Sequence, residues 1–156
     1  MSTSETAAVI RPYADADYAG VVDLFIRVNQ ELAPAEMRDR FDQYIQASID
    51  GEISRLREIF SETRRNVFWV VDAGGEIIGM FGIECRSNEC TELRRMYLDR
   101  RHRGRGIAQQ MLRCAELRAR ELDFAKLILS TAEVQKAAIA LYHKSGYSLV
   151  DRKSVV

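Results

Sequence analysis

The chain has 156 residues, of which 47% are hydrophobic and 29% charged, with nine glycines and two prolines. That length predicts a single domain over residues 1–156 with one sizeable core, and the composition excludes low-complexity and collagen-like chains. No stretch approaches the roughly 20 apolar residues of a membrane helix, and the polar start lacks a signal peptide's apolar segment, so neither membrane insertion nor export is expected. Three scattered cysteines argue against a disulfide framework and a zinc site, and they suit a reducing cytoplasm, the compartment that we expect.

The net charge is zero, but the two parts of the chain carry opposite charge. Residues 1–93 hold 9 Lys and Arg against 17 Asp and Glu, a balance of −8, and residues 94–156 hold 14 against 6, a balance of +8. The basic excess centres on residues 94–105, where six arginines accompany one aspartate. A neutral protein with one concentrated basic segment favours a compact anionic ligand over a long nucleic acid.

Apolar periodicity and turn residues predict the elements in chain order. In the first half we expect strands at residues 9–11, 67–71 and 77–85, a helix from Ala14 to a break at Pro34, and a helix over 37–60 with a break at Gly51. In the second half, strands and helices alternate as strand 91–98, helix 104–122, strand 126–130, helix 133–145 and strand 147–152. The hairpins of the first half predict antiparallel pairing, and the alternation of strands and helices in the second half predicts parallel pairing. The fold class is therefore α/β, with a mixed sheet and helices on both faces.

The strongest functional signal is the segment 96–108, where a strand ends, a glycine-bearing loop follows and a helix begins. The N–H groups and the dipole at a helix start attract phosphate, and Gly104 and Gly106 let the backbone approach a pyrophosphate closely. Arg101, Arg103 and Arg105 can add charge-assisted contacts. The segment is neither a Walker A motif nor the dinucleotide-binding GxGxxG. Taken alone, the pattern fits a helix cap with surface arginines equally well.

Three motifs in the sequence together resemble the GNAT superfamily of acyl-CoA-dependent N-acetyltransferases. The spacing Arg101-x-x-Gly104-x-Gly106 resembles its pyrophosphate loop, residues 92–98 resemble the preceding strand, and residues 138–147 resemble its later helix. The resemblance covers nearly the whole chain. It implies the GNAT fold, a mixed, mostly antiparallel sheet flanked by helices, with acetyl-CoA as the donor. With too few cysteines for a zinc site, we expect no metal.

The resemblance also implies a set of residues that bind the cofactor. These are Met96, Tyr97, Leu98, Arg101, His102, Arg103, Gly104, Arg105, Gly106, Ile107, Ala108 and Gln135. Gln135 departs from the family, which often has Asn there. The family also usually adds a strand after the one near Tyr147, whereas this sequence stops at Val156, so we expect either that this strand is missing or that a homodimer partner covers the open sheet edge.

Acyl transfer to an amine requires a base, because an amine with a reference pKa of about 10 is mostly protonated at neutral pH. Glu92 matches the place where several relatives carry their base, and Glu84 on the neighbouring strand is the second candidate. The alternative for Glu92 is a structural salt bridge with Arg94 or Arg95.

Acyl transfer also requires a hydrogen-bond donor that stabilises the oxyanion and an acid that protonates the departing thiolate. The resemblance implies that the oxyanion donor is a backbone N–H near Leu98 and that Tyr142 is the general acid. The alternative for Tyr142 is a core tyrosine beside Leu141. Tyr97 alternates with Met96 and Leu98 along the strand, so its ring is expected on the opposite face, as packing or as a substrate wall.

The predicted function is an N-acetyltransferase that moves the acetyl group of acetyl-CoA directly to a primary amine. The alternative is a non-catalytic acyl-CoA-binding sensor or interaction module of the same fold, although such a module need not keep Tyr142 and Glu92. Zero net charge and the near absence of aromatics among the arginines disfavour nucleic acid as a partner. The acidic first half favours a cationic small-molecule or peptide amine as the acceptor.

Overall fold

The computed structural model describes residues 7–129, which form one mixed sheet flanked by helices. The strands lie in chain order across the sheet: β1 (Ala8–Pro12), β2 (Val67–Ala73), β3 (Glu76–Cys85), β4 (Cys90–Leu98) and β5 (Lys126–Leu129). The pairings from β1 to β4 are antiparallel, and β4 pairs with β5 in parallel. The predicted mixed, mostly antiparallel sheet is therefore confirmed. The predicted helix 133–145 and strand 147–152 lie outside the described residues.

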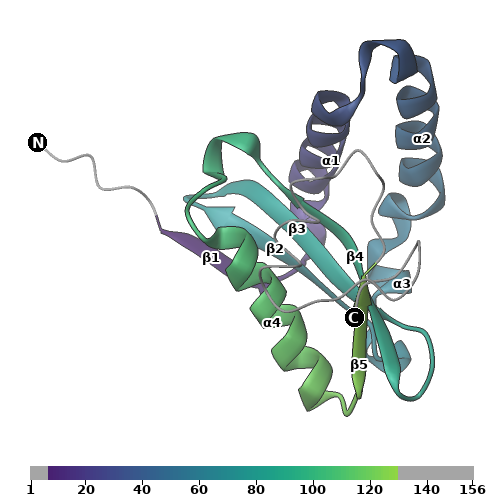
Figure 1. Cartoon of the computed structure of the whole chain (residues 1–156), viewed down its shortest axis with the longest axis vertical. Helices are drawn as coiled ribbons and strands as arrows, with labels where there is room; N and C mark the ends of the chain where they lie inside the picture. Colours follow the sequence, from purple (N-terminus) through teal and green to yellow (C-terminus); the bar gives the residue numbers. More distant parts are fainter. Residues whose placement is uncertain (1–6, 130–156) are drawn as a thin grey trace, which may run out of the picture.

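Helices cover both faces of this sheet, as predicted. Figure 1 shows α1 (Tyr18–Leu32) and α2 (Arg38–Gly51) on one face and α4 (Ile107–Glu121) on the other. The first helix ends before Pro34, because a residue that precedes proline disfavours helical backbone, and Ala33 is extended with φ −71° and ψ 121°. The helix predicted over residues 37–60 breaks at Gly51 and resumes only as short turns and α3 (Leu56–Ile59).

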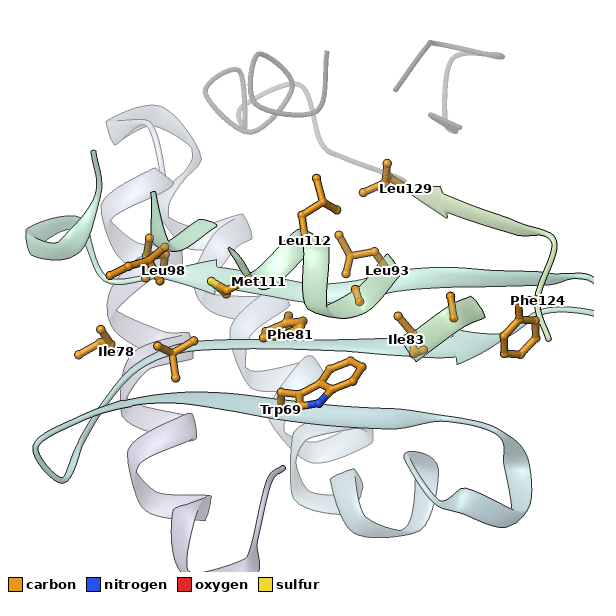
Figure 2. Close-up of a cluster of buried hydrophobic side chains, with 14 residues drawn as sticks. Trp69, Ile78, Phe81, Ile83, Leu93, Leu98, Met111, Leu112, Phe124 and Leu129 are labelled. Atoms are coloured by element: carbon orange, nitrogen blue, oxygen red, sulfur yellow. The ribbon is translucent and has the colours of Figure 1, made fainter. Parts of the chain in front are cut away.

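The sheet separates two hydrophobic clusters. On the α4 side, Trp69, Phe81 and Leu93 pack with Met111 and Leu112 of the helix (Figure 2). The opposite cluster joins α1, α2 and the turns after α2 to the other face of the strands, and its members include Phe25, Phe60, Phe68, Met80 and Tyr97. The central strand β3 is buried on both faces, which explains its nearly continuous apolar sequence.

The helix predicted from Gly104 begins instead at Ile107. Gly104 and Gly106 have φ values of 81° and 80°, in the left-handed region that a right-handed helix excludes. Residues 99–106 are therefore a loop between β4 and α4, with a short 3₁₀ turn over Arg100–His102. We refer to this segment as the 99–106 loop.

Candidate active site

The 99–106 loop begins at Asp99, a buried carboxylate that the sequence analysis did not single out. Its side chain accepts the backbone N–H of Arg101 at 2.9 Å and so caps the 3₁₀ turn. The Arg101 guanidinium adds a contact at 3.0 Å, and Arg27 of α1 reaches the same carboxylate at 3.0 Å. An Asp directly after a strand and just before a turn is a capping signal that the sequence did contain. Asp99 thus connects the loop to α1.

The end of the loop leaves the start of α4 open. Gly106 is the N-cap residue of α4, and none of the described side chains caps the first turn of this helix. The first-turn N–H groups of a helix have no partner within the helix itself. A Cβ atom built on Gly104 or on Gly106 would meet no atom within 4 Å. This open backbone, with the helix dipole behind it, fits a phosphate group.

Two of the predicted phosphate-binding arginines contact the protein itself. Arg101 extends from Asp99 to Glu76 at the start of β3, with an N–O distance of 2.6 Å. The Arg103 guanidinium donates to the carbonyl oxygen of Leu98 from two nitrogens, each at 3.3 Å. Both side chains stabilise the loop in this structure. Their contacts with phosphate stay predictions, and a bound anion would have to share them.

The residues that precede the loop alternate between the two faces of β4. Met96 and Leu98 contact the cluster under α4, whereas Tyr97 packs in the other cluster, as the alternation predicted. The Tyr97 ring meets Phe25 edge to face, with 5.5 Å between ring centroids. Burial, reinforced by the neighbouring Tyr44, raises the pKa of the Tyr97 hydroxyl. Tyr97 is therefore a core residue of the α1 side.

The predicted base Glu92 lies opposite Glu84, the second candidate, on paired strands. The Glu92 carboxylate accepts two hydrogen bonds from Arg86, at 3.0 and 3.2 Å, and lies 3.9 Å from Arg94. Glu84 pairs with Arg94 at 2.6 Å and with Arg86 at 3.2 Å. An ion pair of Glu92 is thus present, with Arg86 as the main partner instead of Arg94 or Arg95. The role of Glu92 as a base stays a prediction.

A comparison with known protein families decides the family of this fold. The family model described as "Acetyltransferase (GNAT) family" matches residues 22–147. This chain belongs to that family. The match spans residues 92–98, 101–106 and 138–147, the three motifs on which the sequence resemblance rested.

Curated relatives support the GNAT assignment. The *Escherichia coli* protein named "Uncharacterized N-acetyltransferase YjgM" is 34% identical over 106 residues, which are 65% of this chain and 62% of the relative. Human N-acetyltransferase 8 is 26% identical over 110 residues, 67% of this chain and 48% of the relative. Zebrafish (*Danio rerio*) N-acetylaspartate synthetase is 28% identical over 108 residues, 69% of this chain and 38% of the relative. The matched regions thus span less than two thirds of each relative's length.

Solved structures show the same GNAT fold. The PaiA N-acetyltransferase of *Thermoplasma acidophilum*, solved in complex with coenzyme A, superposes with a TM-score of 0.78 at 17% identity, covering 96% of both chains. A GNAT acetyltransferase of *Staphylococcus aureus* gives a TM-score of 0.77 at 18% identity, covering 94% of this chain and 87% of that one. At these identities the likeness concerns the fold.

Two predicted site residues of this GNAT chain, Tyr142 and Gln135, lie outside the described residues, as does the predicted open sheet edge. Within residues 7–129, no three His, Cys, Asp or Glu side chains gather as metal ligands. No helix in this described part is both long and apolar enough to cross a membrane.

Replacing the buried carboxylate with Asp99→Asn is expected to lower the free energy of unfolding by about 2 kcal/mol or more at pH 7, because Arg27 and Arg101 lose their shared anion. The Arg101 hydrogen bond, opposed by burial, holds the pKa of Asp99 below its usual range. A carboxylate with a lowered folded-state pKa contributes stability above its unfolded pKa of about 3.9 and loses it as the pH falls through the folded value. Urea unfolding at several pH values should therefore show the difference between wild type and variant shrinking below about pH 4. A difference that stays constant down to pH 2 would contradict this role.

Proposed function

We propose that this GNAT chain is an N-acetyltransferase that moves the acetyl group of acetyl-CoA directly to a primary amine of a small molecule or peptide. The observation that carries the proposal is the 99–106 loop. Its two glycines are left-handed, a Cβ on either would meet no atom within 4 Å, and none of the described side chains caps the start of α4, an arrangement that suits a pyrophosphate. Family membership supports acetyl-CoA as the anion's source, and the *Thermoplasma* relative of the same fold was solved with coenzyme A.

The loop holds the donor, and β4 supplies groups for the chemistry. Bound acetyl-CoA supplies a thioester that is open to attack by an amine. Glu92 accepts a proton from the acceptor ammonium, directly or through water. It can do so while paired with Arg86, because a carboxylate has about four lone-pair sites and only two accept from Arg86.

Two further groups complete the transfer. A backbone N–H near Leu98 donates to the carbonyl oxygen as it gains negative charge. The new C–N bond forms, the C–S bond breaks, and Tyr142 gives its proton to the departing sulfur. The remaining amine proton restores the Tyr142 phenol and Glu92 releases its proton to water, so both residues are regenerated and one proton is released per transfer.

Charge and one relative's name bear on the choice of acceptor amine. The net charge of residues 1–93 favours a cationic amine, but the carboxylates of Glu52, Glu84 and Glu92 beside β4 are all paired with arginines. The name of the zebrafish relative indicates that its product is an acetylated amino acid. An acceptor panel should therefore include polyamines, lysine peptides, and neutral and acidic amino acids.

Thermal unfolding with and without acetyl-CoA, followed by a free-thiol assay over this panel, tests the proposal. At 100 times its dissociation constant a ligand stabilises the fold by about 2.7 kcal/mol, which shifts the melting temperature by roughly 5–10 °C. A shift together with amine-dependent thiol release supports the enzyme. A shift without release from any amine favours the non-catalytic acyl-CoA-binding alternative, and no shift contradicts the donor site.

A further inference from the structure

Strand β4 contains one extra residue at Arg95. Arg94 pairs with Gly82 and Tyr97 pairs with Met80, so Phe81 of β3 faces two residues of β4, Arg95 and Met96. This is a β-bulge. Arg95 has φ 54°, in the left-handed region that side chains other than glycine rarely adopt. The bulge is therefore held in a conformation that the arginine backbone itself disfavours.

The bulge decides which way the following residues face. Leu93 and Met96 both contact the cluster under α4, and Tyr97 contacts the opposite cluster. In a regular strand, residues three positions apart face opposite sides of the sheet. Without the extra residue, the side chains of residues 96–98 would exchange faces, and the 99–106 loop would leave β4 in a different orientation.

The Arg95 side chain is held by residues of α2 and by Glu52, which directly follows this helix. Its guanidinium donates to both oxygens of Glu52, at 3.1 and 3.2 Å. It also donates to the Tyr44 hydroxyl at 2.8 Å and the Ser48 hydroxyl at 3.3 Å. The guanidinium carbon lies 5.5 Å from the centre of the Phe25 ring, and only 10% of the side chain is exposed. This set of contacts opposes the release of Arg95 from the left-handed conformation.

Glu52 is the shared anion of these contacts. It also pairs with Arg94, at 2.9 Å, so two adjacent residues of β4 depend on one carboxylate from the end of α2. Burial would raise the pKa of Glu52, but the bonds and charges of Arg95 and Arg94 lower it, so the carboxylate stays ionised at neutral pH. The ionised form is the one that can hold both arginines.

We propose that Arg95 and Glu52 are positioning residues for acetyl transfer. Together they hold the β4 bulge and so aim the backbone of residues 96–98, which includes the oxyanion donor, at the thioester. This inference rests on the proposed function for its catalytic consequence. Its structural part, that the clamp maintains a strained bulge, concerns the protein without any ligand.

The two variants Arg95→Gly and Arg95→Ala separate this proposal from an ordinary strand contact. Both remove the clamp, but glycine adopts φ 54° without strain whereas alanine does not. Elsewhere in a strand, glycine is the more disruptive of the two. We therefore expect the amides of residues 96–98 to be about fivefold to thirtyfold better protected from hydrogen exchange in Arg95→Gly than in Arg95→Ala, measured without ligand.

The turnover number kcat should also be higher in Arg95→Gly than in Arg95→Ala. In Arg95→Ala the bulge persists but is held less firmly, so kcat is expected to fall about tenfold or more because the reacting groups are misaligned. The KM for acetyl-CoA should stay within about threefold of wild type, because the 99–106 loop keeps its place. Arg95→Gly should recover part of this loss. Glu52→Gln should lower kcat in the wild-type background and have a smaller effect in Arg95→Gly, where only its pair with Arg94 is left to lose. The control is Glu58→Gln. It breaks the exposed ion pair between Glu58 of α3 and Arg55, and it should leave kcat unchanged.

The outcomes keep the two proposals apart. Wild-type exchange protection in Arg95→Ala, or equal or lower protection in Arg95→Gly than in Arg95→Ala, overturns the clamp, whatever the activity. The expected protection order with wild-type kcat in all variants overturns the positioning role. A wild-type protein that neither binds acetyl-CoA nor releases thiol contradicts the proposed function, and the catalytic part of this inference falls with it, while the exchange data still decide the clamp.

Discussion

The double variant Gly104→Val/Gly106→Val is expected to bind acetyl-CoA at least about 100-fold more weakly than wild type. At φ values of 81° and 80°, a valine at either position is strained, so the loop would leave its present conformation. The new side chains would also occupy space that is open in the present structure, because no protein atom lies within 4 Å of a Cβ built at either position. Losing two charge-assisted hydrogen bonds to phosphate, each worth about 1.5–3 kcal/mol, gives a loss of this size. Isothermal titration calorimetry measures it.

The matched control is Gly75→Val in the turn between β2 and β3. Gly75 also has a positive φ, 94°, and open space around its Cβ position, so valine is strained there too. Its affinity for acetyl-CoA should stay within about threefold of wild type, because the turn has no role in the proposed donor site. Melting curves would establish that both variants are folded. Unchanged affinity in the double variant would refute the phosphate loop.

The second large effect is expected from Tyr142→Phe, which should lower kcat about 100-fold while the dissociation constant of acetyl-CoA stays within about twofold of wild type. Without the phenol, the thiolate must leave unprotonated or take its proton from water, and general acid catalysis typically contributes a factor of about 100 or more. The change removes one oxygen atom and leaves the ring, so donor binding should persist. Steady-state thiol release and calorimetry measure the two quantities separately.

Tyr147→Phe provides the comparison for this prediction. It removes the same hydroxyl from a position five residues further on, which is not among the predicted site residues, and kcat should not change. A fall in kcat of the same size in both variants would point to a loss of packing or stability. Wild-type kcat in Tyr142→Phe would remove this residue as the acid.

Much of the fold could be predicted because its signals are local. Apolar runs bounded by turn residues identify β2, β3 and β4, and the Gly74-Gly75 turn specifies the hairpin between the first two. The breaks at Pro34 and Gly51 follow from backbone preferences that act over one or two residues. The start of α4 was predicted too early, because periodicity does not reveal that Gly104 and Gly106 adopt left-handed angles.

The candidate site likewise has features that local sequence predicts and features that depend on residues far apart in the chain. The sequence by itself was enough to predict a phosphate-binding loop, since its spacing and its two glycines lie within a few residues of each other and a family motif records them. Only the tertiary structure decided which charged side chains form ion pairs. Arg86 pairs with Glu92, and Arg27 and Arg101 both pair with Asp99. Glu52 pairs with Arg95, which lies 43 residues further along the chain. Backbone conformation depends on neighbours along the chain, whereas the partner of a charged side chain depends on strand register and helix packing, which bring distant residues together.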